Sequence, residues 1–381
     1  MIAGSKIVVV DNPGTWSDTP HYCVGALRRE IENVIVVGTL DDEQRRPFME
    51  QMKEHYDRTG RKYLPERDFA NLRVRAETIN ETVKLHPDAD AVVVFHPPDV
   101  VFLETDAPIA IIHDATWHQL TSSYPGYLQS DLSEESYQSG FELERIAFDK
   151  ANWLLFMSEW AADAARNEYP ALSHKIRVLY PGANLPEAPE SSVIQQAIEG
   201  RTNGQCRVLF VGYGAWRKGI DIAIGAVECL LASGMDAVLQ VVGVKGEAFW
   251  PSSAVRWRGP LSKFASTEFT LLSQLYQESF VMVLPSRAEC AGIVLCEAAA
   301  FGLPAIVPKV GGMSELVTNG KTGYILAAMA EPSEYAAAIA GLWHDPAGYR
   351  EQCGNARARY QEVLNWDQTA RNLCKLVYNG R

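Results

Sequence analysis

Residues 285–304 read PSRAECAGIVLCEAAAFGLP. A short apolar run ends before this stretch at Leu284, and an apolar, alanine-rich segment begins at Gly292, so the sequence predicts a buried strand, a loop and then a helix. Glu289 then stands at the carboxyl end of the strand, and Glu297 lies about two turns further on, inside the helix. Either acid alone is more often an ordinary solvated carboxylate. Because both acids lie in one strand, loop and helix unit, the pair is a candidate binding site.

The predicted start of this helix offers backbone donors beside the two acids. The first N–H groups of a helix have no partner within it, and they suit a phosphate or a sugar hydroxyl. Here they belong to Gly292, Ile293 and Val294. We therefore expect these three residues to take part in ligand binding.

Short β-branched runs of the same kind recur along the chain, separated by longer amphipathic stretches. This alternation is typical of doubly wound α/β domains, whose parallel strands are buried on both faces. Strands are expected at 7–10, 34–37, 91–95, 109–112, 153–157 and 176–179 in the first half, and at 208–211, 237–242, 255–257, 280–284, 305–307 and 323–326 in the second. Helical patterns lie between them at 66–85, 139–150, 220–232 and 293–300.

A Pro- and Glu-rich segment, residues 180–189, separates the two sets of strands. With a length of 381 residues, at roughly 150 residues per domain, it predicts two Rossmann-like domains of similar size. Doubly wound sheets bind ligands beyond the carboxyl ends of their strands. The functional site is therefore expected in a cleft across which the two domains face each other.

Composition limits the classes of function. The net charge of −12, from 35 Lys and Arg against 47 Asp and Glu, lacks the basic field that nucleic-acid binding needs. The apolar run near the N-terminus is too short for a signal peptide, and no stretch approaches the roughly 18 apolar residues of a membrane span. The seven cysteines include no C-x-x-C pair and fit a reducing compartment. We expect a cytoplasmic protein; peripheral membrane contact and oligomeric state stay open.

A second motif lies at residues 208–221, which read VLFVGYGAWRKGID. They predict a strand, a glycine turn that contains Gly214, two adjacent cations (Arg217 and Lys218) and a helix. Two adjacent cations at a helix start can bind an anionic ligand. The stretch is not a phosphate-binding G-x-x-x-x-G-K-[ST] loop, because Lys218 is followed by Gly219.

Both motifs resemble those of the retaining GT-B glycosyltransferases, family 4 in particular. That family carries P-S-x-x-E-G-F-G-x-x-x-x-E-A-M-A-x-G-x-P-V, which residues 285–304 match at both acids and at the later glycines and proline. Residues 311–323, GGMSELVTNGKTG, match its continuation G-G-x-x-E-x-V-x-x-G-x-x-G. Cys290 and Ala291 stand where Gly-Phe is commoner, so packing beside the donor sugar is expected to differ.

The resemblance implies a role for each charged residue of the two motifs. Glu289 is implied to bind hydroxyls of the donor sugar and Glu297 those of the ribose, since a carboxylate accepts two hydroxyl hydrogens. Lys218 and Arg217 are implied to stabilise the leaving diphosphate. Many members carry Arg where this chain has Tyr213, and whether Arg217 replaces it is left open.

The donor is expected to be a UDP- or GDP-hexose. Backbone groups in the loop after Val242 and around residues 258–263 are expected to bind its base, so Lys263 is expected on the donor side. Gly214, in the turn before the two cations, is expected there as well.

The resemblance places the acceptor in the first half. His113 follows a strand where relatives carry an active-site His, so its ring or backbone is implied to support the reacting centre, with His118 as a second candidate. The loop after the first strand resembles the family's glycine-rich acceptor loop. Its predicted acceptor-side residues are Gly14, Trp16, Ser17 and Thr19.

The family pattern also implies domain limits. Residues 1–182 would form an acceptor-side domain, completed by a C-terminal helix at about 362–381, and residues 183–361 would form the nucleotide-sugar domain. The sequence Asp88-Ala-Asp90 fits the D-x-D of metal-dependent enzymes but precedes a strand, and the histidines lack ligand spacing, so no metal or other cofactor is expected.

The implied activity is metal-independent transfer of a hexose to a hydroxyl of a glycan, a lipid-linked sugar or a small metabolite, with retention at the anomeric carbon by front-side displacement. A sugar phosphorylase or reversible synthase of the same fold, and a non-catalytic nucleotide-sugar-binding protein, remain alternatives. A nicotinamide oxidoreductase is disfavoured because neither half carries G-x-G-x-x-G after its first strand.

Overall fold

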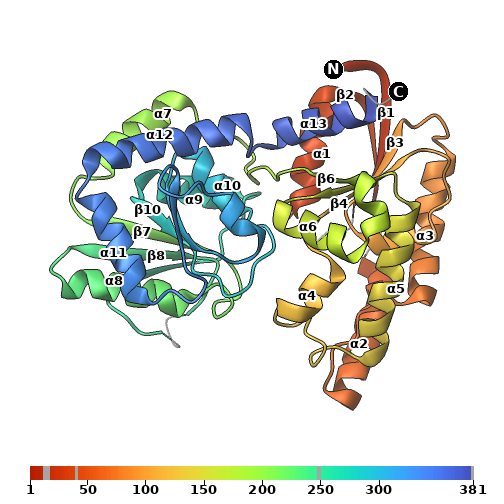
Figure 1. The fold of residues 1–381 in the computed structure, drawn as a ribbon, viewed down its shortest axis with the longest axis horizontal. Helices are drawn as coiled ribbons and strands as arrows, with labels where there is room; N and C mark the ends of the chain where they lie inside the picture. Colours follow the sequence, from red (N-terminus) through yellow and green to blue (C-terminus); the bar gives the residue numbers. More distant parts are fainter. Residues whose placement is uncertain (12–17, 39–41, 247–249, 379–381) are drawn as a thin grey trace. The chain divides into compact units, whose positions relative to one another are not determined.

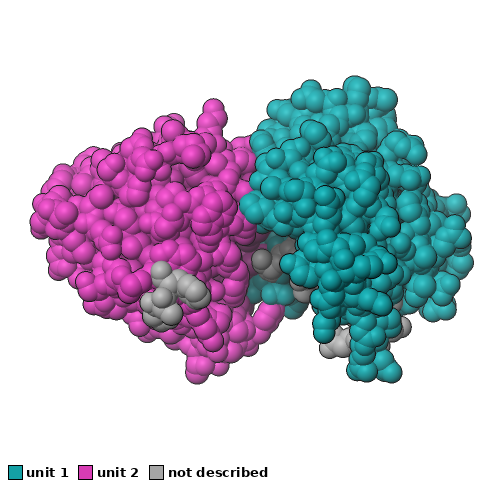
Figure 2. Space-filling view, turned by 90° about the horizontal axis from the view of Figure 1, so that it is seen from below, with its two compact units in different colours: residues 1–180, 366–381 teal, residues 181–365 magenta. Residues whose placement is uncertain are grey.

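A computed structural model describes residues 1–11, 18–38, 42–246 and 250–378 of the chain. The chain forms two compact units: unit 1 comprises residues 1–180 and 366–381, and unit 2 comprises residues 181–365 (Figure 2). Each unit contains a six-stranded parallel sheet flanked by helices, so the predicted pair of doubly wound α/β domains is confirmed (Figure 1). All twelve predicted strands are present. The boundaries predicted after residues 182 and 361 lie near the divisions between the units.

Unit 1 arranges its strands in the order β2-β1-β3-β4-β5-β6. The strands are β1 (Ile2–Asp11), β2 (Ile31–Gly38), β3 (Ala91–Val94), β4 (Ile109–His113), β5 (Trp153–Phe156) and β6 (Ile176–Val178). The α-helices are α1 (Thr19–Glu30), α2 (Asp42–Thr59), α3 (Phe69–Lys84), α4 (Trp117–Ser123), α5 (Glu134–Lys150), α6 (Glu159–Glu168) and α13 (Trp366–Tyr378). Short 3-10 helices are η2 (Pro65–Arg67), η3 (Pro97–Val100) and η4 (Pro170–Lys175).

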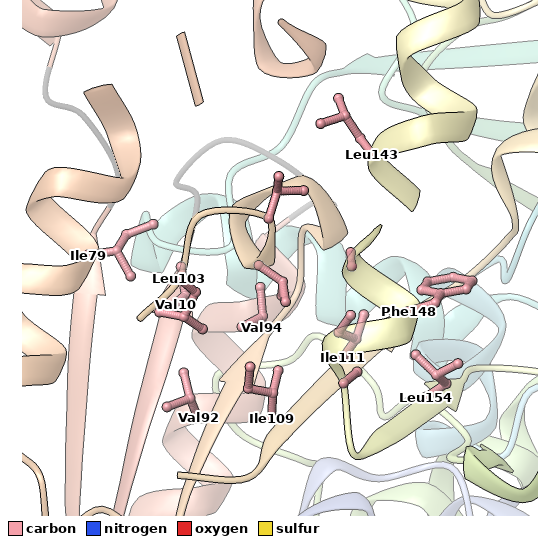
Figure 3. Packing of buried hydrophobic residues seen from close by; sticks show 14 of the residues in the cluster. Val10, Ile79, Val92, Val94, Leu103, Ile109, Ile111, Leu143, Phe148 and Leu154 are labelled. Carbon is pink, nitrogen blue, oxygen red and sulfur yellow. The ribbon is translucent and has the colours of Figure 1, made fainter. Parts of the chain in front are cut away.

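The core of unit 1 follows from its β-branched strands. β1 and β3 pair in register, with Val8 opposite Val92 and Val10 opposite Val94. Side chains from one face of this sheet pack with those of α3 and α5, among them Phe148 (Figure 3). Removing such apolar surface from water contributes about 25 cal/mol per Å², and it holds the strand ends that carry functional residues in fixed positions.

The C-terminal helix belongs to unit 1, where α13 packs against α1 (Figure 1). The Thr369 hydroxyl donates to the Tyr180 carbonyl over 2.8 Å. The Tyr378 hydroxyl donates to the Asp90 carboxylate over 3.1 Å, and that carboxylate also accepts the Lys6 amide over 2.8 Å. The D-x-D sequence is thereby explained as structural, because Asp90 joins β1 to the last helix.

Unit 2 arranges its strands in the order β12-β11-β10-β7-β8-β9. The strands are β7 (Cys206–Val211), β8 (Ala237–Val242), β9 (Val255–Gly259), β10 (Val281–Val283), β11 (Ala305–Pro308) and β12 (Gly323–Leu326). The helices are α7 (Ser191–Gly200), α8 (Ile220–Ala232), α9 (Ser266–Glu278), α10 (Val294–Ala300), α11 (Pro332–Trp343), α12 (Pro346–Glu362) and the 3-10 helix η5 (Gly311–Glu315). Within the described ranges, no helix is both long enough and apolar enough to span a bilayer.

A buried arginine ties the helices of unit 2 together. Arg201, which follows α7, is only 2% exposed. Its guanidinium donates to four carbonyl oxygens at 2.8–3.2 Å, those of Tyr276, Gln277, Phe301 and Gly302. Because these carbonyls lie at the ends of α9 and α10, the single side chain satisfies acceptors that neither helix can pair internally.

We predict that Arg201→Met lowers the free energy of unfolding of unit 2 by at least about 3 kcal/mol, because several buried carbonyls lose their donor. The matched control is Arg350→Met on the exposed side of α12, which should change stability by less than about 0.5 kcal/mol. Urea unfolding followed by circular dichroism measures both. Equal stabilities of the two variants would contradict the structural role of Arg201.

Candidate active site

Sheet order brings the two sequence motifs together in unit 2. β10 pairs with β7, with Val281 opposite Val208, so the loops after these strands leave the sheet side by side. The Arg287 amide donates to the Arg217 carbonyl over 2.8 Å, and the Arg287 guanidinium binds both oxygens of Asp221 at 2.7 and 2.8 Å. These contacts hold the loop of residues 284–293 against the loop of residues 212–219.

Gly219 permits this close approach. Its φ of +73° lies in the left-handed region, and a Cβ atom there would stand 2.1 Å from the Pro285 carbonyl oxygen. Any side chain at this position would separate the two loops. The glycine that follows Lys218 is therefore required by the contact between the loops, which the sequence motif alone did not reveal.

Glu289 lies where the loops meet, with its side chain 10% exposed. One carboxylate oxygen, Oε2, accepts hydrogen bonds from the Lys218 ammonium and, over 3.3 Å, from the Arg217 guanidinium. Arg217 also donates to the Ala288 carbonyl over 2.8 Å. The structure thus brings together three of the residues predicted to act in catalysis.

The charge of this cluster follows from its surroundings. Burial alone would raise the pKa of Glu289, but the adjacent charges of Lys218 and Arg217 outweigh burial and hold that pKa below its ordinary value. The carboxylate is therefore ionised at neutral pH. Two cations against one anion leave the cluster with net positive charge.

Glu297 is fully buried inside α10. One of its oxygens accepts from the Lys263 ammonium and the other from the Tyr276 hydroxyl over 2.9 Å. Burial, followed by the neighbouring Glu297 charge, raises the pKa of Tyr276 well above its ordinary value, so the hydroxyl stays protonated and donates. Sequence reasoning named Lys263 and Glu297 separately but missed both their pairing and the part of Tyr276, which comes from α9.

The remaining predicted donor-side residues lie in the same two loops. Gly292 has φ +73°, and Ile293 precedes α10 with no side chain capping the helix. Val294 is the first residue of α10. Gly214 also has φ +73°, and its Cβ position would lie 3.7 Å from the Arg217 Nε atom.

In unit 1, His113 is the last residue of β4 and is 5% exposed. Its Nδ1 atom accepts the Ala115 amide over 3.3 Å, so a neutral ring carries its proton on Nε2. Burial, then the charge of Arg67, lowers the pKa of His113 to about 3. The ring is therefore neutral near pH 7. Because its Nδ1 atom is occupied and its pKa is low, it is a poor general base, and its Nε2–H group is a hydrogen-bond donor.

A buried carboxylate that sequence reasoning did not single out supports the segment after His113. Glu144 of α5 accepts the Trp117 amide over 2.7 Å and the Tyr169 hydroxyl over 2.8 Å. Burial raises the pKa of Glu144 to about 7. Thr116 caps α4 through a reciprocal pair of bonds with Gln119. No local pattern marks Glu144, because its partners come from distant parts of the chain.

The other predicted positions are placed as follows. Gly14, Trp16 and Ser17 lie outside the described residues. Thr19 begins α1 and is buried, and His118 is exposed on α4. Within the described part of the chain, no three His, Cys, Asp or Glu side chains are grouped as metal ligands would be.

Comparison with known proteins adds an independent finding. Residues 194–360 match the family described as Glycosyl transferases group 1. The D-inositol 3-phosphate glycosyltransferase of Streptomyces avermitilis is 28% identical over 262 residues, which cover 64% of this chain and 54% of that protein. The glycogen synthase of Mycobacterium tuberculosis is 31% identical over 178 residues, 46% of this chain and 42% of that protein. The chain thus spans about half the length of these curated relatives.

Solved structures share the fold at low sequence identity. The crystal structure of Anabaena HepE in complex with UDP-glucose superimposes with a TM-score of 0.65 at 16% identity, covering 98% of this chain and 99% of that one. The GT-B architecture implied by the sequence resemblance is therefore confirmed.

The neutral His113 predicts a pH dependence of stability. The unfolded chain binds a proton at this position below about pH 6.5, whereas the folded chain stays neutral until about pH 3. This difference in the pKa of His113 contributes to the free energy of unfolding above about pH 6.5, the pKa in the unfolded chain, and the contribution is lost as the pH falls below that value. From about pH 7 to about pH 5.5, wild type should lose about 1 kcal/mol more than His113→Asn, whose amide oxygen can still accept the Ala115 amide.

Urea unfolding at the two pH values measures this difference. Parallel losses in the two proteins would show that His113 is protonated in the folded state.

Proposed function

Because residues 194–360 match the group 1 glycosyltransferase family, we propose that this chain transfers a hexose from a nucleoside-diphosphate sugar to a hydroxyl acceptor. One observation carries the proposal: Lys218 and Arg217 converge on the buried carboxylate of Glu289 where β7 and β10 end side by side. A net positive cluster at this edge of a doubly wound sheet suits a diphosphate.

The two cations act on the leaving group. As the bond between the anomeric carbon and the diphosphate oxygen breaks, negative charge grows on that oxygen, and Lys218 and Arg217 stabilise it. The acceptor hydroxyl forms its new bond on the same face of the sugar and gives its proton to the departing oxygen. Because the departing oxygen takes the proton, the reaction needs no separate general base. This agrees with a His113 ring that is neutral and weakly basic.

Glu289 holds the donor sugar through its second oxygen. Both cations bind Oε2, and among the described residues no group donates to Oε1. Oε1 is therefore available to accept a hydrogen bond from a sugar hydroxyl, while the cations keep the carboxylate ionised. The same residue thus orients the cations and binds the group that is transferred.

The nucleoside is bound by the neighbouring loop and α10. Because both oxygens of Glu297 already accept hydrogen bonds, a ribose hydroxyl reaches this carboxylate by sharing it with Lys263, the more exposed partner. The backbone N–H groups of Gly292, Ile293 and Val294 and the turn at Gly214 complete the donor site in our proposal.

Unit 1 would receive the acceptor. The Nε2–H group of His113 and the acceptor-side positions Gly14, Trp16, Ser17 and Thr19 are its proposed contacts. HepE, which shares the fold, was solved with UDP-glucose, so this is the first donor to test, followed by GDP-hexoses.

We predict that Lys218→Ala and Glu289→Ala each lower turnover by about 10²-fold or more, because each removes a charged group from the reacting centre. Release of nucleoside diphosphate from UDP-glucose or GDP-mannose without acceptor measures slow donor hydrolysis in each protein. Lys321→Ala, an exposed lysine beyond η5, is the matched control and should retain the wild-type rate.

Circular dichroism spectra and unfolding curves verify that the variants fold. The proposal fails if folded wild type hydrolyses none of these donors, or if the two active-site variants hydrolyse them as fast as wild type.

A further inference from the structure

Unit 1 contains a buried arginine that the proposed mechanism does not use. Arg67 ends η2 and is 7% exposed. Its guanidinium lies 3.7 Å from the ring centre of Trp117, which is fully buried. Two hydrogen bonds fix the backbone of Arg67. Its amide donates to the Leu64 carbonyl over 2.9 Å, and the Ser139 hydroxyl donates to the Arg67 carbonyl over 2.6 Å.

Within the described part of the chain, the Arg67 guanidinium has no acceptor. Among the residues that the structure describes, none accepts a hydrogen bond from it or forms an ion pair with it, although it carries five N–H donors. Buried arginines elsewhere in this chain are paired: Arg201 with four carbonyls, and Arg75 with Asp99 at 2.6 Å. No nitrogen of Arg67 is among the fully buried side-chain atoms without a partner in the described structure, so its N–H groups are accessible to solvent. A guanidinium that has no acceptor in the described chain and is accessible in this way can bind an acceptor supplied from outside the chain.

The nearest buried carboxylate does not fill this role. Both oxygens of Glu144 are occupied, by the Trp117 amide and the Tyr169 hydroxyl. The Arg67 charge lowers the pKa of Glu144 only slightly against the dominant effect of burial, which raises it, and the described residues show no ion pair between the two side chains. Arg67 is therefore held in place by stacking and by its backbone rather than by a carboxylate.

A second cation lies on the other member of the same aromatic pair. The ring of Tyr127 meets Trp117 edge to face, with centroids 6.2 Å apart. The Lys62 ammonium stands 4.2 Å from the centre of the Tyr127 ring, and in the described structure it too donates to no oxygen. Two cations that have no acceptor among the described residues therefore lie on one aromatic pair.

This cluster lies close to the carboxyl end of β4. Trp117 is four residues beyond His113, and the Arg67 charge acts on the pKa of His113 after burial. Ligands of doubly wound sheets bind at this edge. The cations proposed for the donor diphosphate, Lys218 and Arg217, belong to unit 2. An anion bound in unit 1 is therefore better assigned to the acceptor.

We propose that Arg67, assisted by Lys62, binds an oxyanion carried by the acceptor, either a phosphate or a carboxylate. This inference rests on the proposed glycosyl transfer for the identity of the ligand as acceptor. A guanidinium that is fixed on an aromatic face presents its N–H edge to an oxyanion with little loss of freedom on binding.

Isothermal titration tests the proposal with inorganic phosphate and, separately, acetate. The full chain is first incubated with excess UDP, so that the donor diphosphate site is filled. We expect saturable binding of one oxyanion, weakened at least about tenfold by Arg67→Met, since a hydrogen bond to a charged group is lost. The control, Arg73→Met, replaces an exposed arginine that also stacks on a ring, that of Phe102 at 4.9 Å, and should bind as wild type does.

The outcomes separate the possible ligands. Tighter binding of phosphate indicates a phosphorylated acceptor, and tighter binding of acetate a carboxylate-bearing one. No saturable binding of either to wild type, or equal binding by folded Arg67→Met, overturns the proposal.

If Arg67→Met does not fold, hydrogen exchange on the wild-type protein tests the proposal instead. Phosphate or acetate should protect amides near residues 64–67 and 113–121, and absence of that protection overturns the inference.

UDP binding, measured on the same samples, reports the donor site. UDP binding without oxyanion binding therefore refutes this inference alone, whereas failure to bind any nucleotide counts against the proposed function.

Discussion

The adjacency of β7 and β10 is the constraint on which the site depends. Strands β7, β8 and β9 run outward in one direction from this point, and β10, β11 and β12 in the other. At such a reversal of strand order a crevice lies beyond the carboxyl ends of the two neighbouring strands, and ligands bind there. Here one loop carries Arg217 and Lys218 and the other carries Glu289, so the topology itself brings opposite charges together.

The chain treats its buried charges in two ways, and the difference separates structure from proposed function. Arg201 is saturated by carbonyls, so it buries its charge with full hydrogen bonding. The Glu289 cluster keeps an excess of positive charge, and Arg67 has no acceptor among the described residues. Charge left unbalanced in a folded protein marks the places where a ligand can supply the balance.

Much of this arrangement was predictable from sequence, because it depends on local patterns. Short apolar runs marked all twelve strands, and the strand-end position of Glu289 and Lys218 followed from the strand, loop and helix order. The contacts of Tyr276, Glu144 and Arg67 were not predictable, because their partners are distant in the chain. The register of packed helices decides which side chains meet, and composition does not encode that register.

The most direct test of the central claim is the affinity for UDP of Glu289→Gln and Lys218→Met, measured by isothermal titration. In this account Glu289 holds the two cations but is not itself a diphosphate ligand. Glu289→Gln should therefore bind UDP at least as tightly as wild type, since the cations lose a competing anion, whereas Lys218→Met should bind about tenfold or more weakly. Equal weakening by both substitutions, in folded proteins, would contradict the account.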